Sequence, residues 1–288
     1  MGKTLGYVIV SPAKDEESYI EFTIQSVIKQ SIKPVLWVIV DDGSKDKTPE
    51  IVRHWSDVYS FIQLLRNPGN GDRQPGARVV RAFNYGYKVA KAIPHDLVVK
   101  LDCDLSFEAD YFEKILKRFQ ENKQLGIASG VYFERNKNGL WEEIQMPWYH
   151  AAGACKVVRR TCFEEIGGFI AAAGWDTLDE IRAMTKGWHT GHFRDLEIKH
   201  HKAEGSGIGI IKTSIMHGEI FYRLGGNKLF LLAKSLRRMT KKPYVTAGLA
   251  LIWGYLRSAL TFKKLLVTPM EAQFYNVLLR KRLLKLYN

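Results

Sequence analysis

The stretch DLVVKLDCD, residues 96–104, joins an apolar run to a pair of acids. The apolar part predicts a buried strand over 96–101, which Asp102, Cys103 and Asp104 follow. Because residues i and i+2 of an extended chain point to the same face, the two carboxylates converge while Cys103 points away. Two carboxylates that leave open positions suit Mg²⁺ or Mn²⁺ beside a diphosphate. The alternative is a pair of solvated loop acids that cap the next helix.

Further apolar runs precede this stretch, and helical spacing separates them. Continuous apolar strands separated by helices predict an α/β fold with a Rossmann-like, mostly parallel sheet flanked by helices on both faces. In such sheets ligands bind at the carboxyl ends of the strands, which is where the acids lie. The expected strands are 5–11, 35–40 and 61–65, and the expected helices are 16–30, 47–55, 78–92 and 108–120.

Two turns at predicted strand ends are candidates for nucleotide binding. Asp41 and Asp42 open the turn after strand 35–40, where a carboxylate can accept hydrogen bonds from a nucleobase N–H or a ribose hydroxyl. The turn at 11–16, SPAKDE, can present backbone groups to a base. For both turns the alternative is a plain turn that caps the following helix.

These elements, in this order and spacing, resemble the inverting family 2 glycosyltransferases of the GT-A fold. The resemblance covers about residues 5–220, and the ordered set of motifs is more specific than any one of them. Its pieces are VSPAKDEE (10–17), VDDGSKDKT (40–48), G-A-x(4)-A-x-N-x-G (76–86), DCD (102–104), IGGF (166–169) and GWDTLDE (174–180).

The resemblance implies the roles of individual residues. A Glu-Asp pair at the start of a helix carries the acceptor-activating base in this family, which assigns Asp176 as the catalytic base. Trp175 stands where the family often has Glu, so Asp179 and Glu180 remain rivals for the role. The alternative for Asp176 is a favourable interaction with the positive end of the helix. The donor nucleotide is assigned to Pro12, Ala13, Asp15, Glu16, Asp41, Asp42, Arg78 and Asp102.

The metal is expected on Asp104, with Asp102 on the metal or the ribose. In some GT-A enzymes a downstream histidine completes the metal site, which points to His201 in the sequence HHK at 200–202. A surface histidine pair is the alternative. Trp175, Asp179 and Lys202 are further candidates for contacts with the acceptor or the diphosphate.

The amino-acid composition limits the classes of protein to which the chain can belong. A chain of 288 residues that is 46% hydrophobic and 25% charged is an ordinary globular protein, which excludes disordered and collagen-like chains. Three cysteines without C-x-x-C spacing argue against a disulfide framework or a zinc site, so a reducing compartment is expected. Pro12 and Lys14 cut the first apolar run short, which favours a strand over a signal peptide.

The charge is concentrated at the C-terminus. Residues 223–288 hold 14 lysines and arginines against one acid, whereas residues 1–222 are neutral. We therefore expect a GT-A catalytic domain at 1–222, with a nucleotide-binding half at about 1–105 and an acceptor half at about 106–222, followed by a basic helical extension at 223–288.

The extension favours an anionic membrane surface as partner. Its longest uncharged run, 243–256, has 14 residues, short of the roughly 20 that a spanning helix needs. Basic and apolar residues mix at helical spacing in 230–238, around Trp253, and in 277–287, as in helices that lie in the plane of a membrane. The alternative is a helical cap with solvated charge. No nucleic-acid module accompanies the charge.

The sequence thus predicts a metal-dependent inverting glycosyltransferase that uses Mn²⁺ or Mg²⁺. It would move a sugar from a nucleotide-diphosphate donor, UDP-sugar favoured by the family, to a glycan or lipid-linked acceptor hydroxyl in surface polysaccharide or glycolipid synthesis. A cytoplasmic, peripheral place at the inner face of the membrane follows from the extension. A sugar-phosphate nucleotidyltransferase or a dehydrogenase would need a glycine-rich loop after the first strand, which SPAKDEE lacks. The alternative is a GT-A-like nucleotide- or membrane-binding protein without catalysis.

Overall fold

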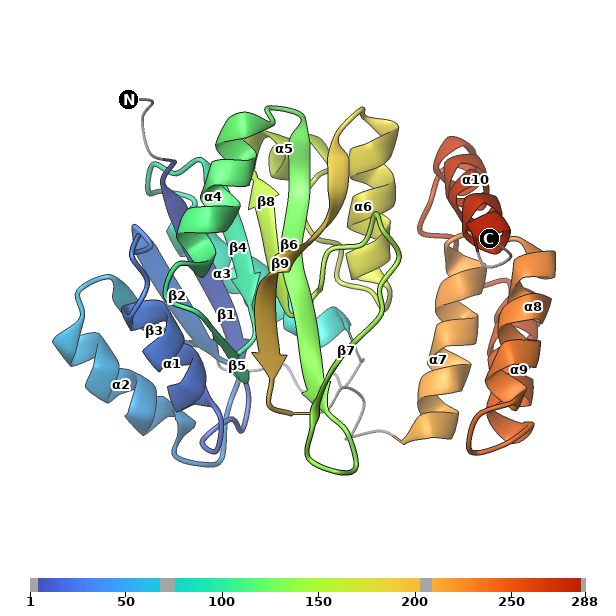
Figure 1. Ribbon diagram of the computed structural model, residues 1–288, viewed down its shortest axis with the longest axis horizontal. Helices are drawn as coiled ribbons and strands as arrows, with labels where there is room; N and C mark the ends of the chain where they lie inside the picture. The colour runs from blue at the N-terminus through green and yellow to red at the C-terminus, as the bar shows by residue number, and fades with distance from the viewer. Residues whose placement is uncertain (1–4, 68–75, 203–208, 286–288) are drawn as a thin grey trace. The chain divides into compact units, whose positions relative to one another are not determined.

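The computed structural model describes residues 5–67, 76–202 and 209–285 (Figure 1). The chain divides into two compact units, Met1–Ala203 and Glu204–Asn288. The predicted domain boundary is at 222, whereas helix α7 (Ile210–Arg223) falls in the C-terminal unit and packs along α9 (Thr246–Leu260).

A nine-stranded sheet runs through the described part of the N-terminal unit, in the order β3-β2-β1-β4-β8-β6-β9-β5, with β7 paired to β6. The strands expected up to residue 101 are confirmed within a few residues. The later strands β5, β7, β8 and β9 were not predicted, since their sequences are short or carry many polar residues. The strands are β1 (Tyr7–Ala13), β2 (Leu36–Asp41), β3 (Ile62–Arg66), β4 (Leu97–Leu101), β5 (Leu105–Phe107), β6 (Leu125–Arg135), β7 (Trp141–Glu143), β8 (Cys155–Arg159) and β9 (His189–His200).

The sheet is parallel in its first half and mixed in its second. β1, β2, β3 and β4 pair in parallel, as predicted. Beyond β4, strand β8 enters antiparallel to both β4 and β6, and β9 returns parallel to β6. The prediction of a mostly parallel sheet therefore holds for the nucleotide-binding half, whose strands alternate with helices in the sequence.

Helices cover both faces of this sheet, as the apolar strands predict. Alternate residues of β1 serve the two faces: Tyr7 and Ile9 pack with α1, α2 and α4, whereas Val8 and Val10 pack with α3, α5 and α6. On the second face, a Cβ added to Gly86 would come within 2.5 Å of Val40, so glycine lets α3 lie close on the strands. The helices are α1 (Ile20–Ile28), α2 (Thr48–Val58), α3 (Ala77–Ala90), α4 (Tyr111–Glu121), α5 (Arg160–Glu165) and α6 (Trp175–Thr185).

The C-terminal unit is helical, as predicted for the extension. Besides α7 and α9 it contains α8 (Lys228–Met239) and α10 (Pro269–Lys285); Pro243 lies between α8 and α9, and Pro269 begins α10. A Cβ on Gly254 would lie 2.0 Å from the Ile215 carbonyl oxygen, so α7 and α9 touch backbone to backbone.

Within the described ranges, none of the helices combines the length and the apolar character needed to cross a membrane. The last residues of the segment 277–287 expected to be amphipathic lie outside those ranges.

Candidate functional site

The predicted nucleotide turns meet at the carboxyl ends of neighbouring strands. Ala13, the last residue of β1, pairs with Asp41 at the end of β2, and its carbonyl accepts the Asp42 amide at 2.9 Å. Pro12, also at the end of β1, receives a hydrogen bond from the Cys103 thiol at 3.7 Å. Cys103 is buried and turned toward β1, which agrees with the expected alternation along 102–104.

The turn that follows β1 is fixed against the start of α2. Asp15 takes a positive φ of 54°, and its carboxylate accepts the Lys45 amide at 2.7 Å. The Glu16 amide donates to the Thr48 hydroxyl at 2.8 Å. These contacts occupy the residues before Ile20, so α1 begins later than predicted.

Asp102 and Asp104 have different surroundings. Asp102 lies 2.5 Å from the Lys100 ammonium, Oδ1 to Nζ, and Lys100 also donates to the Gly153 carbonyl at 2.8 Å. Asp104 is 7% exposed, and its Oδ2 lies 3.2 Å from Nε2 of His200. The other oxygen of Asp104, Oδ1, is buried without a hydrogen-bond partner among the described residues. A buried carboxylate oxygen in that state normally costs free energy, and a bound cation would satisfy it.

Glu16 forms a second incompletely satisfied carboxylate. Its Oε1 accepts a hydrogen bond from Lys202 at 2.8 Å, whereas its Oε2 is buried without a partner among the described residues. Burial raises the pKa of Glu16 to about 7, and the charges of Asp104 and Asp102 act in the same direction against Lys202. The structure thus joins Glu16 and Lys202, which are far apart in the sequence, to the acidic pair.

The histidine beside Asp104 is His200, not the predicted His201. His200 ends β9, and its Nδ1 lies 2.9 Å from Glu134 Oε1, so the imidazole bridges two carboxylates. Burial alone would lower the pKa of His200, but Asp104 and Glu134 raise it to about 9. The His201 side chain is directed elsewhere: its Nε2 lies 2.8 Å from the Ser106 hydroxyl, and its ring stacks on Phe22.

Asp41 and Asp42 are both buried, but their carboxylates are engaged. Asp41 Oδ1 accepts the Ser44 amide at 2.9 Å in the turn. Asp42 pairs with Arg78 and also accepts the Asn67 side-chain amide at 2.8 Å. Arg78, which was assigned to the donor, is therefore held by Asp42, and it also donates to the Asp42 carbonyl at 2.7 Å.

Helix α6 separates the three candidates for the catalytic base. Asp179 and Glu180 are at most 2% exposed, and each has a carboxylate oxygen 3.1 Å from the Lys156 ammonium. Burial raises the pKa of Asp179, whereas the two carboxylates together raise that of Lys156. Glu180 additionally accepts the Ala151 amide at 2.7 Å. Both rivals are thus part of a buried ion cluster.

Asp176 is the partly exposed acid of the first turn of α6. A Cβ added to Gly153 would lie 3.5 Å from Asp176 Oδ2, so this carboxylate adjoins the backbone that Lys100 anchors to Asp102. Trp175 was a candidate for acceptor contact, but it is 7% exposed, and the ammonium groups of Lys100 and Lys156 lie 5.6 and 5.3 Å from its ring centroid. Trp175 therefore packs beneath the site, against the two buried lysines.

Sequence reasoning missed the buried lysines that organise these acids. Lys100 and Lys156 lie in the mainly buried strands β4 and β8, and both are at most 3% exposed. A lysine inside a buried strand nearly always has an acidic partner, so the sequence carried a usable signal for Lys100, two residues before Asp102. It carried none for the link between Lys156 and α6, which only the fold makes.

The donor set suits a hard divalent cation that keeps open positions. No ready-made cluster of three or more His, Cys, Asp or Glu ligands occurs in the residues that the structure describes. The unpartnered Asp104 oxygen is nevertheless the group that Mn²⁺ or Mg²⁺ prefers, and both ions commonly take most of their ligands from water and phosphates.

Comparisons with known proteins show the family to which the chain belongs. Residues 8–173, more than half of the chain, match the family described as glycosyl transferase family 2. The poly-beta-1,6-N-acetyl-D-glucosamine synthases of Staphylococcus aureus and Staphylococcus epidermidis are 26% and 27% identical over 152 and 143 residues. The matches cover 52% and 49% of this chain, and about a third of each relative, 34% and 32%.

Solved structures share the fold at low sequence identity. The mannosyltransferase PcManGT from Pyrobaculum calidifontis, in complex with GDP-Man and Mn²⁺, has a TM-score of 0.56 at 16% identity, over 99% of this chain and 82% of that one. TarS 1–349 from Staphylococcus aureus has a TM-score of 0.56 at 14% identity, over 94% and 78%. GalNAc-T7 with UDP, GalNAc and Mn²⁺ has a TM-score of 0.56 at 15% identity, over 70% and 44%.

These likenesses confirm the GT-A type of α/β fold expected from the sequence. Together with the family match over the strands and turns that build the acidic edge, they place the protein: the chain belongs to glycosyl transferase family 2.

Proposed function

We propose that this protein is a metal-dependent inverting glycosyltransferase that moves a sugar from a nucleotide-diphosphate donor to a hydroxyl of a glycan or lipid-linked acceptor. The observation that carries the proposal is the unpartnered, buried oxygen of Asp104 at the carboxyl end of the sheet, next to Asp102 and His200. This arrangement supports metal-dependent binding of the donor, and transfer activity is what separates an enzyme from a binding protein without catalysis.

The chain's residues have distinct roles in this proposal. Asp104 and Asp102 would hold the cation, with His200 rather than His201 as the neighbouring imidazole. When bound, such a cation neutralises the leaving diphosphate. Lys202 contacts Glu16 within this acidic edge and would bind the diphosphate through its ammonium group. The ends of β1 and β2, from Pro12 to Glu16 and at Asp41 and Asp42, receive the nucleoside.

Asp176 removes the proton of the acceptor hydroxyl as that hydroxyl attacks the anomeric carbon, so the configuration inverts. Of the three acids of α6, Asp176 is the one whose carboxylate is partly exposed and outside the Lys156 cluster.

The relatives and the solved structures support a class of donor and a class of acceptor. The TarS structures include complexes with UDP and UDP-GlcNAc, and PcManGT was solved with GDP-Man, so a nucleotide sugar is the expected donor and UDP remains favoured. The staphylococcal relatives are named for synthesis of a polysaccharide, which fits a glycan or lipid-linked acceptor in surface polysaccharide synthesis.

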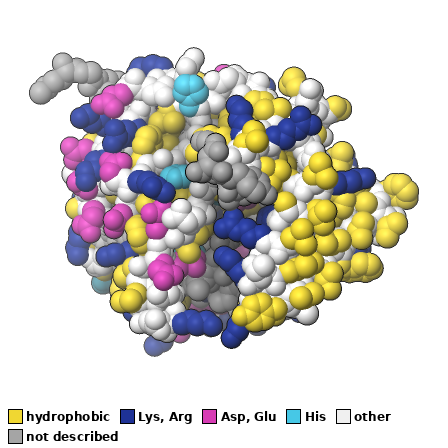
Figure 2. Space-filling view, turned by 45° about the vertical axis from the view of Figure 1, so that its right-hand side comes forward, with side chains coloured by type: hydrophobic (Ala, Val, Ile, Leu, Met, Phe, Trp, Pro, Cys, Tyr) yellow, Lys and Arg dark blue, Asp and Glu magenta, His cyan; other side chains and the backbone are white. Residues whose placement is uncertain are grey.

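We further propose that the C-terminal unit binds the surface of an anionic membrane at the cytoplasmic face. Residues 204–288 carry 15 lysines and arginines against three glutamates. Leu229 and Leu236 on α8 and Trp253 and Leu260 on α9 are each more than half exposed. Figure 2 shows hydrophobic side chains gathered on one broad face. Apolar side chains beside excess positive charge suit the boundary between head groups and acyl chains.

A ligand-stabilisation experiment tests the donor site. The full chain would be unfolded thermally with UDP-, GDP- and TDP-sugars, with and without Mn²⁺. A donor at 100 times its Kd should add roughly 2.7 kcal/mol to the free energy of unfolding. Asp104→Asn should abolish the Mn²⁺-dependent part of the shift. The matched control is Asp57→Asn, an exposed acid of α2, which should leave it intact.

Two results would contradict the proposal. One is the absence of a shift with every nucleotide sugar, and the other is an equal shift in the wild type and Asp104→Asn. A shift without any transfer activity would instead favour the binding protein without catalysis.

A further inference from the structure

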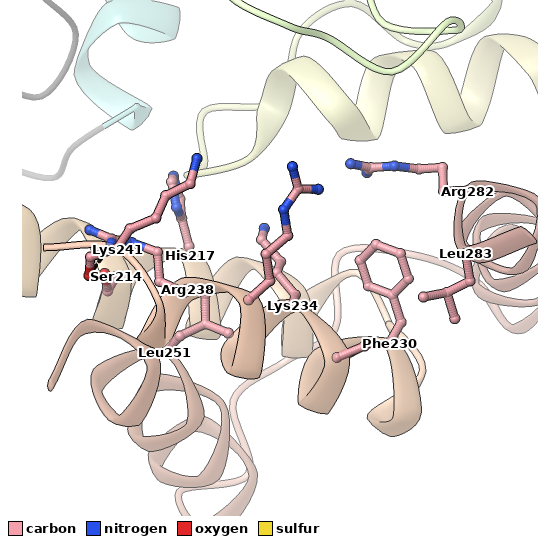
Figure 3. A pocket seen from close by; sticks show the side chains of 11 residues that line it. Ser214, His217, Phe230, Lys234, Arg238, Lys241, Leu251, Arg282 and Leu283 are labelled. Carbon is pink, nitrogen blue, oxygen red and sulfur yellow. Dashed lines mark hydrogen bonds between the residues drawn. The ribbon is translucent and has the colours of Figure 1, made fainter. Parts of the chain in front are cut away.

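The C-terminal unit contains a pocket of its own, separate from the acidic edge. It has a volume of about 610 Å³, within the range of ordinary ligand pockets, and α7, α8, α9 and α10 all contribute to its walls. The lining residues are Ser214, His217, Phe230, Ala233, Lys234, Arg237, Arg238, Lys241, Leu251, Arg282 and Leu283 (Figure 3).

The charge of this pocket has a single sign. Five lysines and arginines line it, and none of its lining residues in the described part of the chain is an acid. Lys234, Lys241 and Arg282 extend into the same opening (Figure 3). Within the described ranges no carboxylate forms an ion pair with any of the five; Arg238 donates only to the Lys241 and Lys242 carbonyls, at 3.4 and 3.2 Å. Gathering five like charges is unfavourable unless an anion compensates them.

The same pocket has an apolar wall. Phe230 and Leu251 are buried in the unit, and the Arg282 guanidinium lies 5.3 Å from the Phe230 ring centroid. This contact fixes the guanidinium plane at the pocket while its N–H groups stay available. A guanidinium fork matches the oxygens of a phosphate in two parallel hydrogen bonds, which a carboxylate-free pocket leaves open for a ligand.

The pocket also adjoins the face proposed to meet the membrane. On α8, Leu229, Leu232 and Leu236 recur at helical spacing and are at least half exposed. Lys234 and Arg237 recur at the same spacing on a neighbouring side of the helix and line the pocket. A ligand with a charged head and a hydrocarbon tail can therefore reach both surfaces of one helix at once.

We propose that this pocket binds the phosphate head of a lipid, a phosphomonoester or diphosphate carried on a hydrocarbon chain. The inference rests on the proposed membrane association but not on catalysis. Arg237, Arg282 and Lys234 hold the phosphate oxygens, and the Leu229–Leu236 stripe meets the chain. In an enzyme that acts on lipid-linked acceptors, such a site would hold the phosphate head of an acceptor lipid or of a membrane phospholipid.

Vesicle binding by the full chain, without nucleotide sugar, tests the proposal. Phosphatidylcholine vesicles would contain phosphatidic acid, or phosphatidylserine as a head group without a phosphomonoester. The pocket variant is Arg237→Gln with Arg282→Gln. The control, Arg280→Gln with Lys281→Gln, removes the same charge from exposed residues of α10 that do not line the pocket. Thermal unfolding verifies folding, and Lys234→Gln with Lys241→Gln replaces the pocket variant if that pair unfolds.

The pocket variant should lose about tenfold or more of its affinity for phosphatidic acid, as expected for two charge-assisted hydrogen bonds. The control should lose much less. Equal losses in the two variants, no preference for phosphatidic acid, or no vesicle binding by the wild type would each overturn the proposal. Inorganic pyrophosphate is the second probe: if it binds as tightly as the vesicles do, the site takes a soluble phosphate and the lipid assignment fails.

The proposed transferase activity can fail separately from this site. Asp176→Asn should bind phosphatidic acid vesicles like the wild type, because its carboxylate lies in the other unit. Intact lipid binding in a protein that transfers no sugar would count against the catalytic proposal alone.

Discussion

The two units treat electrical charge in opposite ways. In the N-terminal unit, buried charges are compensated inside the fold: Lys156 is fully buried between Asp179 and Glu180, and Lys100 pairs with Asp102. In the C-terminal unit, Lys234 and Arg237 are exposed, and no acid pairs with them in the described ranges. The buried ion pairs of the N-terminal unit hold side chains in fixed positions, as catalysis requires. The cations without an acidic partner in the C-terminal unit can bind an anion from outside the protein.

We expect the largest effect, on kcat, from Asp176, the acid of α6 whose carboxylate lies outside the buried ion cluster. Asp176→Asn keeps the shape of the side chain but removes the base, so kcat should fall by about 10²- to 10⁴-fold while donor binding persists. Radiolabelled sugar transfer and nucleotide-induced thermal shifts measure the two properties. Asp57→Asn is the control. Unchanged turnover in Asp176→Asn would mean that another residue is the catalytic base.

The buried ion cluster should dominate stability. Lys156→Met leaves Asp179 and Glu180 buried without their cation, which should cost about 3–5 kcal/mol in the free energy of unfolding. The same change in the C-terminal unit, Lys281→Met, removes an exposed cation of α10 and should change stability by less than about 0.5 kcal/mol. Urea unfolding compares the two variants. Similar costs at both positions would erase the distinction between the units.

The acidic edge should make the metal-free protein sensitive to pH. The pKa of His200 is raised to about 9, above the roughly 6.5 of an unfolded histidine, so the folded state holds its proton more tightly. The resulting stabilisation is complete below about pH 6.5 and is lost as the pH rises to about 9, by about 3 kcal/mol at most. Chemical unfolding at several pH values in EDTA measures it.

His200→Gln should flatten that dependence, because glutamine does not titrate. His201→Gln is the matched control, since that imidazole contacts Ser106 and Phe22 instead of Asp104, and it should leave the slope between pH 6.5 and 9 in place. An unchanged slope in His200→Gln would assign the effect to another group.

The smallest effect concerns the exposed apolar face. Trp253 is 54% exposed on α9, so Trp253→Ser should leave the free energy of unfolding nearly unchanged and weaken binding to anionic vesicles by about 10- to 100-fold. Leu140→Ser, at a residue 64% exposed in the N-terminal unit, should do neither. Vesicle co-sedimentation at rising salt measures both the apolar and the electrostatic part. Equal binding by all three proteins would contradict the membrane proposal.

Much of the N-terminal unit was predictable because its strands and turns follow from short stretches of the sequence. Continuous apolar runs followed by acidic turns identified β1, β2 and β4, and the parallel pairing of β1 with β2 places Ala13 beside Asp41. The later strands were not predictable in the same way. β9 is a long strand of polar and charged residues, and it is held by its pairing with β6 and β5 rather than by its own pattern.

Particular site residues show the same limit. His200 and His201 are indistinguishable in sequence, and the register Leu105↔His200 between β5 and β9 determines which of them meets Asp104. Arg78 was assigned to the donor nucleotide, and in the structure α3 brings its guanidinium to Asp42.

The sequence by itself determined the parallel half of the sheet, the acids at its carboxyl edge and the basic character of the C-terminal helices, since periodicity, turn residues and charge are local properties. Only the tertiary structure decided which charges compensate one another: Glu16 with Lys202, Asp179 and Glu180 with Lys156, and a C-terminal pocket of cations with no acid among its lining residues. Electrostatic compensation depends on distance in space and on burial, and residues far apart in the sequence acquire both only when the chain folds.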